Sequence, residues 1–214
     1  MRIGILGSGD VGQTLGSGFA AVGHEVMLGS RSPASERAVA WRERVGGTAR
    51  TGSFAETGEF GEVAILATLW GGTQNALELA GATCLGGKVV LDVTNPFVFE
   101  PNQPPGLALG HTDSGGEQVQ RWLPSARVVK SLNTVGYAHM VQPAFPEGRP
   151  DAFMCGNELL AKDVITDLLG QIGWDPIDIG GIEGARLLEP LAALHFTYAI
   201  RTGGWNHAFR LLRK

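Results

Sequence analysis

The sequence is poor in the residues that build metal and disulfide sites. It has only two cysteines, Cys84 and Cys155, which lie far apart and outside any CxxC or cysteine–histidine spacing. A disulfide framework and a zinc site are therefore not indicated, and we expect both cysteines to be buried thiols. No apolar run approaches the ~18 residues of a membrane span, and no signal-like region precedes the first predicted strand. These absences predict a cytoplasmic protein without a membrane partner.

The 214-residue chain also lacks a concentrated basic region. Its formal net charge is −4, which argues against nucleic acid or an anionic membrane as the main partner. Apolar residues make up 43% of the chain, as expected for a globular protein with an adequate core. The length fits one large domain or a domain with an extension, and we find no internal repeat.

The first thirty residues contain a strand, a glycine turn and a helix in that order. The apolar run Arg2–Leu6 leads directly into Gly7-Ser8-Gly9-Asp10-Val11-Gly12. In such a GxGxxG turn the first glycine permits a tight turn, the second admits a pyrophosphate, and the third lets the helix approach the strand. The following helix would point its N-terminal amides at the phosphates. The pattern predicts a dinucleotide site, with a ligand-free structural turn as the alternative.

The end of the second predicted strand, residues 24–28, indicates which dinucleotide is bound. An NAD site places Asp or Glu here for the ribose 2′-hydroxyl, but this chain has Ser30, Arg31 and Ser32 instead. Hydroxyls and a guanidinium suit a phosphate ester, so we expect NADP. Ser32-Pro33 further predicts an N-cap and a first helical residue, bringing a second helix N-terminus to this phosphate. The alternative for Arg31 is a solvated surface charge.

The rest of the chain alternates between predicted strands and helices. This predicts an α/β fold with a Rossmann-type, doubly wound and mostly parallel sheet, comprising an NADP-binding domain at 1–136 and a C-terminal α/β extension at 137–214. Segment 97–113 has no periodicity and is expected to be an ordered loop or a lid. The expected strands are 48–51, 63–67, 88–92, 127–130, 152–155 and 176–179, and the expected helices are 35–44, 53–58, 74–80, 114–123, 158–169 and 185–201.

Three polar loops follow predicted strands and should meet at one edge of the sheet. Ligands of open parallel sheets bind outside the carboxyl ends of the strands, so these loops should face the glycine turn. The residues concerned are Thr68, Leu69 and Trp70 in the first loop, Thr94 and Asn95 in the second, and Asn133, Thr134, Val135 and Gly136 in the third.

Groups that could transfer protons are scarce in these loops. Lys130 ends a strand and is expected to be structural, whereas Tyr137 and His139 are better placed for an acid role but lack a visible partner. His195 lies on an apolar helical stripe and should be a hydrogen-bonded core or interface histidine.

The predicted helix at 185–201 has an apolar face. Leu187, Leu191, Leu194 and Tyr198 recur at helical spacing, so we expect this face to pack against the sheet or a partner subunit.

These motifs resemble the coenzyme F420-dependent NADP oxidoreductase family and its bacterial dinucleotide-binding relatives. The chain is also similar to the cytosolic reductase domain of the STEAP metalloreductases. The matching pieces are Gly7–Gly12, Gly29-Ser30-Arg31, the Trp70 loop, residues 128–134, Met154-Cys155-Gly156 and residues 185–191.

The resemblance implies hydride transfer between NADPH and a flavin or deazaflavin. It further implies that Ser30 and Arg31 hold the 2′-phosphate, that Trp70, Asn95 and the 133–136 loop surround the nicotinamide, and that a homodimer forms through the C-terminal helices. Residues 92–96 and the longer insert after them depart from the archaeal enzymes, which leaves the acceptor open. The membrane helices of STEAP proteins have no counterpart in this sequence.

The leading hypothesis is an NADP-dependent oxidoreductase that transfers hydride to a small-molecule acceptor, coenzyme F420, FMN or FAD. Such rings need positioning and no strong acid or base, so no catalytic residue is assigned and Trp70, Asn133, Tyr137 and His139 are positioning candidates. One alternative is an NADPH-dependent reductase of a small carbonyl or imine that uses Tyr137 or His139. The other is a non-catalytic NADP-binding or sensing module.

Overall fold

An eight-stranded sheet runs through the computed structural model, which describes residues 1–101, 103–212 and 214. Its order is β10-β9-β8-β5-β4-β1-β2-β3. The six strands from β8 to β3 are parallel, β9 is antiparallel to β8, and β10 is parallel to β9. This confirms the Rossmann-type, mostly parallel sheet. The strands are β1 (Arg2–Leu6), β2 (Glu25–Gly29), β3 (Ala49–Gly52), β4 (Val63–Leu66), β5 (Val89–Asp92), β8 (Arg127–Lys130), β9 (Asp151–Gly156) and β10 (Asp175–Asp178).

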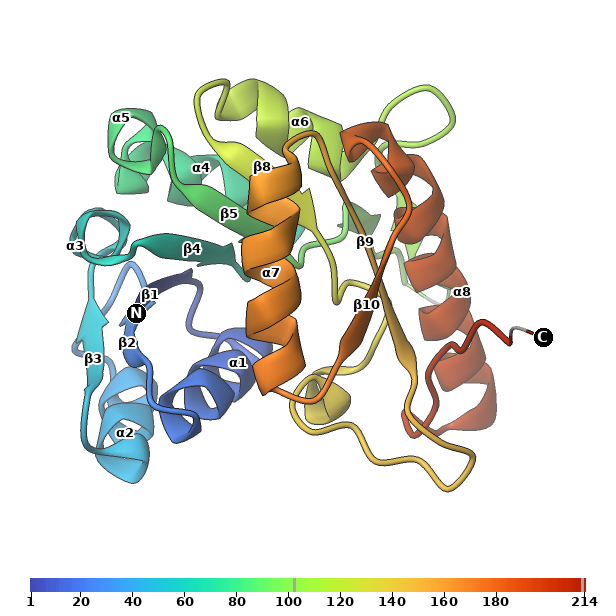
Figure 1. Ribbon diagram of the computed structural model, residues 1–214, viewed down its shortest axis with the longest axis horizontal. Helices are drawn as coiled ribbons and strands as arrows, with labels where there is room; N and C mark the ends of the chain where they lie inside the picture. The colour runs from blue at the N-terminus through green and yellow to red at the C-terminus, as the bar shows by residue number, and fades with distance from the viewer. Residues whose placement is uncertain (102, 213) are drawn as a thin grey trace.

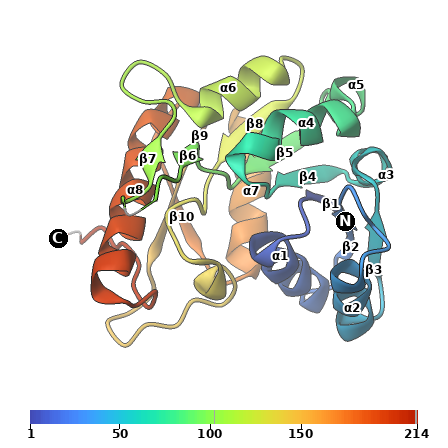
Figure 2. The same cartoon turned by 180° about the vertical axis from the view of Figure 1, so that it is seen from behind.

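Helices cover both faces of this sheet (Figures 1 and 2). One face packs against α1 (Asp10–Ala21), α2 (Glu36–Val45) and α7 (Leu159–Gln171). The other packs against α3 (Phe54–Phe60), α4 (Trp70–Ala80), α5 (Ala82–Leu85), α6 (Gly115–Trp122) and the first half of α8 (Ala185–Thr202). Two 3₁₀ turns, η1 (Tyr137–His139) and η2 (Ile182–Gly184), connect strands to later elements.

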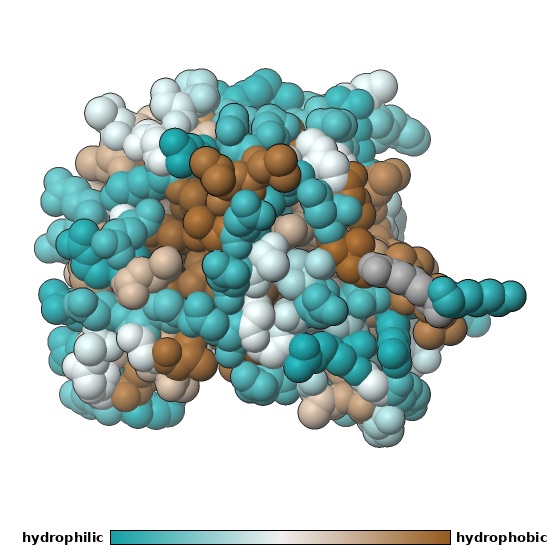
Figure 3. All heavy atoms as spheres, in the orientation of Figure 1, coloured by the Kyte–Doolittle hydropathy of each residue, from teal (hydrophilic) through white to brown (hydrophobic). Residues whose placement is uncertain are grey.

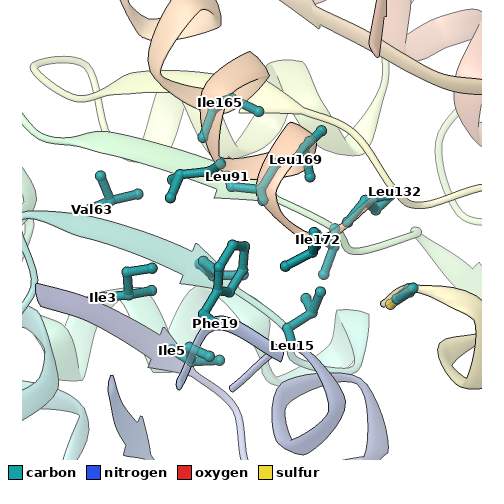
Figure 4. Packing of buried hydrophobic residues seen from close by; sticks show 14 of the residues in the cluster. Ile3, Ile5, Leu15, Phe19, Val63, Leu91, Leu132, Ile165, Leu169 and Ile172 are labelled. Carbon is teal, nitrogen blue, oxygen red and sulfur yellow. The ribbon is translucent and has the colours of Figure 1, made fainter. Parts of the chain in front are cut away.

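The core forms as two layers because alternate strand residues point to opposite faces. On one side, Ile3 and Ile5 of β1 and Leu91 of β5 share one cluster with Leu15 and Phe19 of α1 and Ile165 of α7 (Figure 4). On the other, Leu6 contributes to a separate cluster. Each large apolar side chain buried in this way contributes roughly 1.5–3 kcal/mol. The nearly continuous apolar strands thus reflect a sheet that is covered on both faces.

Helix α2 lies close to the expected range 35–44, but it is not capped where the Ser32-Pro33 pair predicts. Its N-cap is Ser35, which accepts from the amide of Ala38, so the predicted N-cap at Ser32 and first helical residue at Pro33 are wrong. Residues 32–35 instead form a turn closed by a hydrogen bond from the Ser35 amide to the Ser32 carbonyl. A serine three residues further on, with no proline after it, competes successfully for the cap.

At two other predicted helix starts, the predicted serine is the N-cap of the helix. The full capping box of Ser53 and Glu56 opens α3 as expected. In α6, Ser114 accepts from the Glu117 amide, but the Glu117 carboxylate accepts from the Ser114 hydroxyl and not from its amide. The second box is therefore only half formed.

The aperiodic segment 97–113 contains a short antiparallel hairpin. Its strands are β6 (Phe97–Val98) and β7 (Gly106–Leu107), paired Phe97 to Leu107 and Val98 to Gly106. Figure 2 shows the hairpin beside α8, with which β7 is in contact. Position 102 lies outside the described residues. A two-stranded hairpin is marginal alone, so the contact with α8 helps to hold it.

Helix α8 buries a different stripe from the one expected. Leu188, Ala192 and Ala199 are buried, whereas Leu187 and Leu194 are 70% and 57% exposed. The exposed stripe does not pack against the sheet, because the stripe one residue further on faces the protein; of the two expected packing partners, a partner subunit stays a prediction. Figure 3 shows apolar atoms gathered near the start of α7 and beside α8. No helix among the described residues is long and apolar enough to cross a membrane.

The two thiols differ in their surroundings. Cys155 is fully buried and its burial raises the pKa of the thiol to about 12, as suits an inert core residue. Cys84 is only half-buried, so the expectation of two buried thiols is wrong for it. It lies in the short helix α5, of which Leu85 is the buried residue.

Candidate functional site

A cleft of about 950 Å³ opens at the carboxyl ends of β1, β2, β4 and β5. It lies where the connections leave the sheet in opposite directions, between β1 and β4, which is the usual ligand position in open α/β sheets. It is lined by Gly7, Ser8, Gly9, Asp10, Val11, Ser30, Arg31, Arg37, Phe54, Ala67, Thr68, Leu69, Trp70, Gly71, Gly72, Asn75, Val93, Thr94, Asn95, Phe97, Phe99, Tyr137 and Phe196.

The glycine turn forms the floor of this cleft. Gly7 has a φ of 132°, and a Cβ there would lie 2.2 Å from the Ala67 carbonyl oxygen. A Cβ on Gly12 would lie 2.0 Å from the carbonyl oxygen of Gly7, so helix and turn are in direct backbone contact. Gly9 differs, because a Cβ there would meet nothing within 4 Å and the residue lines the cleft. The open space above Gly9 is a cradle that fits a pyrophosphate.

Helix α1 presents uncapped amides to the same space. Gly9 is its N-cap and supplies no side-chain hydrogen bond, and the first intrahelical bond runs from the Gln13 amide to the Gly9 carbonyl. The free first-turn amides and the helix dipole together favour an anion at this end. Asp10 in this first turn pairs with Arg37, which offsets the negative charge next to the anion position.

Ser30 and Arg31 follow the end of β2, and Arg37 of α2 lines the same cleft. Ser30 is buried and accepts a hydrogen bond from the Ser32 amide, which leaves its own hydroxyl hydrogen free to donate. Arg31 and Arg37 line the cleft beside it. The Ser32 side chain is exposed and is not part of the lining. Arg37 was missed because it belongs to a predicted helix with alternating charges, typical of a solvated surface.

Helix α4 brings a third element to the cleft. It begins at Trp70, four residues before the predicted start, because glycines are tolerated in a first turn whose amides need no intrahelical partner. Trp70 stacks on Trp122 of α6, with ring centroids 5.5 Å apart. Thr68 is held by a 2.9 Å hydroxyl contact with Thr73. Thr68, Leu69 and Trp70 line the cleft as expected, Thr68 and Leu69 from the loop after β4 and Trp70 from the first residue of α4.

A buried ionic network supports the loop after β5. The Lys130 ammonium donates to Asp92 at 2.8 Å and to the Thr94 carbonyl at 2.7 Å, and lies 3.1 Å from Glu189 of α8. Asp92 also accepts from the amide and hydroxyl of Thr94. Burial alone lowers the pKa of Lys130, but the carboxylates of Asp92 and Glu189 outweigh it and raise the pKa. This confirms the structural interpretation of Lys130.

Asn95 and Asn133 form a reciprocal pair. The Asn95 side chain donates to the Asn133 carbonyl at 2.9 Å, and the Asn133 side chain donates to Asn95 Oδ1 at 3.0 Å and to the Leu188 carbonyl at 3.1 Å. Asn95 lines the cleft, whereas Asn133 lies behind it. Asn133 Oδ1 is buried without a hydrogen-bond partner among the described residues. The geometry makes Asn133 a support for Asn95.

The loop after β8 approaches the cleft only at its end. Thr134 and Val135 are buried and Gly136 is half-buried, but none of the three lines the cleft. Tyr137, half exposed, does. His139 does not; its ring nitrogen lies 3.1 Å from Asn206 Oδ1 and its ring tilts against Phe145. Of the two candidate acids, only Tyr137 reaches the cleft.

Three phenylalanines complete the far end of the cleft: Phe97, which ends the second of the loops expected to face it, and Phe99 and Phe196, which the sequence interpretation missed. Phe97 and Phe99 come from the hairpin and Phe196 from α8, and we call this group the aromatic corner. The Phe97 and Phe196 rings meet edge to face at 4.7 Å. Their separation of about one hundred residues hid the contact, because only the folded chain places α8 beside the insert.

His195 lies next to Phe196 but faces the interior. It is 1% exposed, and among the described residues neither ring nitrogen has a hydrogen-bond partner. The expectation of a hydrogen-bonded histidine is therefore wrong. Burial among aromatic rings, with His207 and His139 nearby, lowers the pKa of His195 to about 4, so the ring is neutral near pH 7. Elsewhere in the described chain, no three His, Cys, Asp or Glu side chains gather as a metal site.

Comparison with known proteins identifies the family. Residues 2–96 match the family model described as NADP oxidoreductase, coenzyme F420-dependent. A crystal structure from Arthrobacter sp. FB24, provisionally described as an F420-dependent NADP-reductase, is 35% identical over the full length of both chains and superposes with a TM-score of 0.93. The chain belongs to the family of F420-dependent NADP oxidoreductases. It is thus a member of a family of NADP-dependent oxidoreductases, as the sequence motifs indicate.

Two further relatives match this family member over different shares of their own length. The F420-dependent NADP reductase of Methanothermobacter marburgensis is 29% identical, with coverage of 99% of this chain and 98% of that protein. The metalloreductase STEAP3 of Rattus norvegicus is 28% identical over 89% of this chain, but the match covers only 36% of STEAP3. The chain therefore spans about a third of that relative.

Proposed function

We propose that this protein is an NADPH-dependent oxidoreductase that transfers hydride between NADP(H) and coenzyme F420 or a flavin. One observation carries the cofactor assignment: Ser30 and Arg31 follow β2 where an NAD site would hold a carboxylate, and Arg37 of α2 lines the same cleft. A guanidinium pair matches the charge and geometry of a phosphate ester and gains nothing from a neutral hydroxyl. The family membership supports the same assignment.

Each part of the cleft has a role in this proposal. Ser30, Arg31 and Arg37 would bind the 2′-phosphate, and the Ser8–Val11 backbone at the start of α1 the pyrophosphate. Thr68, Leu69, Trp70, Thr94 and Asn95 would surround the nicotinamide. Asn133 to Gly136 would act from behind, chiefly through the Asn95–Asn133 pair. Residues 1–136 would thus bind the dinucleotide, and residues 137–214 would complete the acceptor side.

The reaction requires little from the protein beyond positioning. Bound NADPH supplies a hydride, which the acceptor ring takes up together with one proton from solvent, so that NADP⁺ and the two-electron-reduced ring result. Among the described lining residues, those near Asn95 contribute amide, hydroxyl and aromatic side chains and no carboxylate. These groups can orient the two rings and exclude water. Holding the reacting rings in place in this way lowers the activation barrier for hydride transfer.

A binding experiment tests the cofactor. Arg31→Ala should weaken NADPH binding by about 10- to 150-fold, equivalent to ~1.5–3 kcal/mol for a charge-assisted contact, and leave NADH binding nearly unchanged. Arg50→Ala, which removes an exposed arginine paired with Glu25 away from the cleft, is the matched control. An equal loss for NADPH and NADH in Arg31→Ala would refute the 2′-phosphate role.

A panel of acceptors tests the reaction. Purified protein and NADPH should reduce at least one of F420, FMN and FAD, followed by loss of NADPH absorbance under anaerobic conditions. If none is reduced, the ring-acceptor class is wrong.

Tyr137 supports a second candidate, reduction of a small carbonyl or imine, because its hydroxyl-bearing side chain is the one potential proton donor of the two candidates that reaches the cleft. Carbonyl or imine reduction that falls at least tenfold in Tyr137→Phe, with NADPH binding retained, would favour this reaction. Tight NADPH binding without turnover on any acceptor would instead favour a sensing module.

We also propose a homodimer that covers the exposed stripe of Leu187, Leu194 and Tyr198 on α8, since a large wet apolar face favours association. Sedimentation equilibrium should give twice the monomer mass, and Leu194→Glu should give the monomer.

A cytoplasmic location is proposed as well, because the two cysteines are free thiols suited to a reducing compartment. Cell fractionation would test it.

A further inference from the structure

The buried ionic network of Asp92, Lys130 and Glu189 lies directly behind the cleft. The three side chains are at most 1% exposed. Thr94 contacts the network through all of its polar groups, because its amide and hydroxyl donate to Asp92 and its carbonyl accepts from Lys130. Thr94 also lines the cleft. The network is therefore in direct contact with the lining.

Helix α6 connects the same network to a second part of the lining. The Glu189 carboxylate accepts from the amides of Gly115 and Gly116, at 2.9 and 3.0 Å. A Cβ on Gly115 would lie 3.2 Å from the Trp70 ring and 3.3 Å from Pro96, so the start of α6 lies against both. The network thus backs the loops after β4 and β5, which the proposed function assigns to the nicotinamide.

The contacts of the network favour two ionised acids. Glu189 accepts from two amides and from the Lys130 ammonium, and Asp92 accepts from this ammonium and from Thr94. Amides and an ammonium can only donate, as carboxylates require. Lys130 keeps its proton because both carboxylates raise its pKa despite burial. Two carboxylates and one ammonium leave one negative charge uncompensated.

The surroundings of the network offset this charge only in part. The other charges around α6 are paired with each other, Arg186 with Glu117 and Arg121 with Asp113. Cys155 is close to the network, but burial raises the pKa of its thiol to about 12, so it is neutral. The N-terminus of α6 contributes about half a positive charge. A net negative charge therefore remains behind the lining.

We propose that the uncompensated charge of the buried ionic network strengthens the binding of NADP⁺ relative to NADPH, which makes bound NADPH a stronger hydride donor than it would be without this charge. The oxidised nicotinamide ring carries a positive charge that the reduced ring lacks, and a nearby buried negative charge stabilises it. This rests on the proposed function, because it places the nicotinamide beside Trp70, Thr94 and Asn95.

Titration of both cofactor forms by calorimetry, which needs no turnover, tests the sign of the effect. Glu189→Gln removes the excess charge at nearly the same shape. It should weaken NADP⁺ relative to NADPH by about 3- to 10-fold, the size expected for one charge at an effective dielectric constant of about 20 or above. Asp92→Asn should shift the ratio of the two dissociation constants in the same direction. Lys130→Met removes a positive charge and should shift it in the opposite direction.

The opposite signs separate an electrostatic role from a structural one. Damage to the fold would change the ratio in the same direction, or not at all, whichever charge is removed. Glu25→Gln is the matched control, because Glu25 is an exposed residue paired with Arg50 at the start of β2, away from the cleft. It should leave the ratio within about twofold, since exposed charges are screened.

Circular dichroism identifies the variants that fold, and if Lys130→Met does not, the two carboxylate variants decide. A ratio that is unchanged in both carboxylate variants, or that moves the same way when either sign of charge is removed, would overturn the proposal.

The outcomes also separate this proposal from the proposed function. If the ratio shifts as expected but no acceptor is reduced, the electrostatic role stands and the oxidoreductase assignment fails. If acceptors are reduced and the ratio is the same in all variants, the electrostatic role fails and the oxidoreductase assignment stands. If the wild type binds neither NADP⁺ nor NADPH, both fail.

Discussion

Lys130 shows how one buried cation holds several parts of the site in register. Its ammonium joins β5 through Asp92, the following loop through the Thr94 carbonyl, and α8 through Glu189. Glu189 in turn accepts from the amides of Gly115 and Gly116 and so caps α6. A lysine at a strand end is visible in the sequence, but its three partners are distant in the chain and their convergence is not.

Removing this cation should be strongly destabilising. Lys130→Met leaves two buried carboxylates without their counter-charge, and we expect a loss of about 3–5 kcal/mol in the free energy of unfolding. Lys162→Met is the matched control, because its partner Asp178 is 39% exposed and can be rehydrated, so about 1 kcal/mol should be lost. Urea denaturation of both variants measures the difference. Similar losses would show that the Lys130 network contributes no more than a surface pair.

At the scale of elements, the turn between β1 and α1 contains some glycines that the fold requires and one that leaves space for a ligand. Gly7 and Gly12 are required by backbone contacts within the protein, whereas the space at Gly9 faces the cleft. The same six-residue motif therefore contains glycines with two different purposes. Sequence order alone identified the motif, because strand, turn and helix are all local.

Alanine substitutions should distinguish the two purposes. In Gly12→Ala the new Cβ would lie 2.0 Å from the Gly7 oxygen, so the helix must shift, and we expect about 1–3 kcal/mol of lost stability. Gly9→Ala should leave the unfolding free energy within about 0.5 kcal/mol of wild type but weaken NADPH at least tenfold, since the methyl group would occupy the cradle. Thermal denaturation and NADPH titration report the two effects. Unchanged NADPH binding in Gly9→Ala would place the pyrophosphate elsewhere.

At the scale of the whole molecule, the C-terminal third returns to a cleft built by the N-terminal half. Strands β9 and β10 extend the sheet, and α8 then runs back so that Glu189 reaches Lys130 of β8 and Phe196 reaches the hairpin. The same return buries His195 behind Gly136, whose Cβ position lies 3.9 Å from its ring nitrogen. Burial of this histidine links the stability of the whole protein to pH.

The expected pH dependence follows from the lowered pKa of His195. Desolvation, with His207 and His139 adding to it, lowers the folded-state pKa to about 4, against about 6.5 in an unfolded chain. Between these values the unfolded chain binds a proton that the folded protein excludes, so stability falls as pH falls from 6.5 toward 4. The contribution lost by pH 4.5 is roughly 2–3 kcal/mol. Urea denaturation from pH 7 to 4.5 should show a smaller loss in His195→Phe; an identical loss would contradict this account.

The features that the sequence by itself determined are local ones. The alternating strands and helices, the glycine turn, Ser30 and Arg31, and the Ser53 capping box each depend on neighbouring residues, whose periodicity and spacing can be read directly. Boundaries were less secure where two signals competed, as at Ser32 against Ser35 and at the glycines that open α4.

Tertiary structure decided the features that depend on distant segments meeting. Arg37 lines the cleft only because α2 lies across from α1, and the aromatic corner exists only because α8 packs beside the hairpin. Likewise, helical spacing showed that α8 is apolar, but it did not show which of two adjoining stripes would be buried. Both stripes have the same period, so only the position of the neighbouring elements decides which one faces the protein. Periodicity describes one element at a time, whereas a binding site is formed by the relative placement of several.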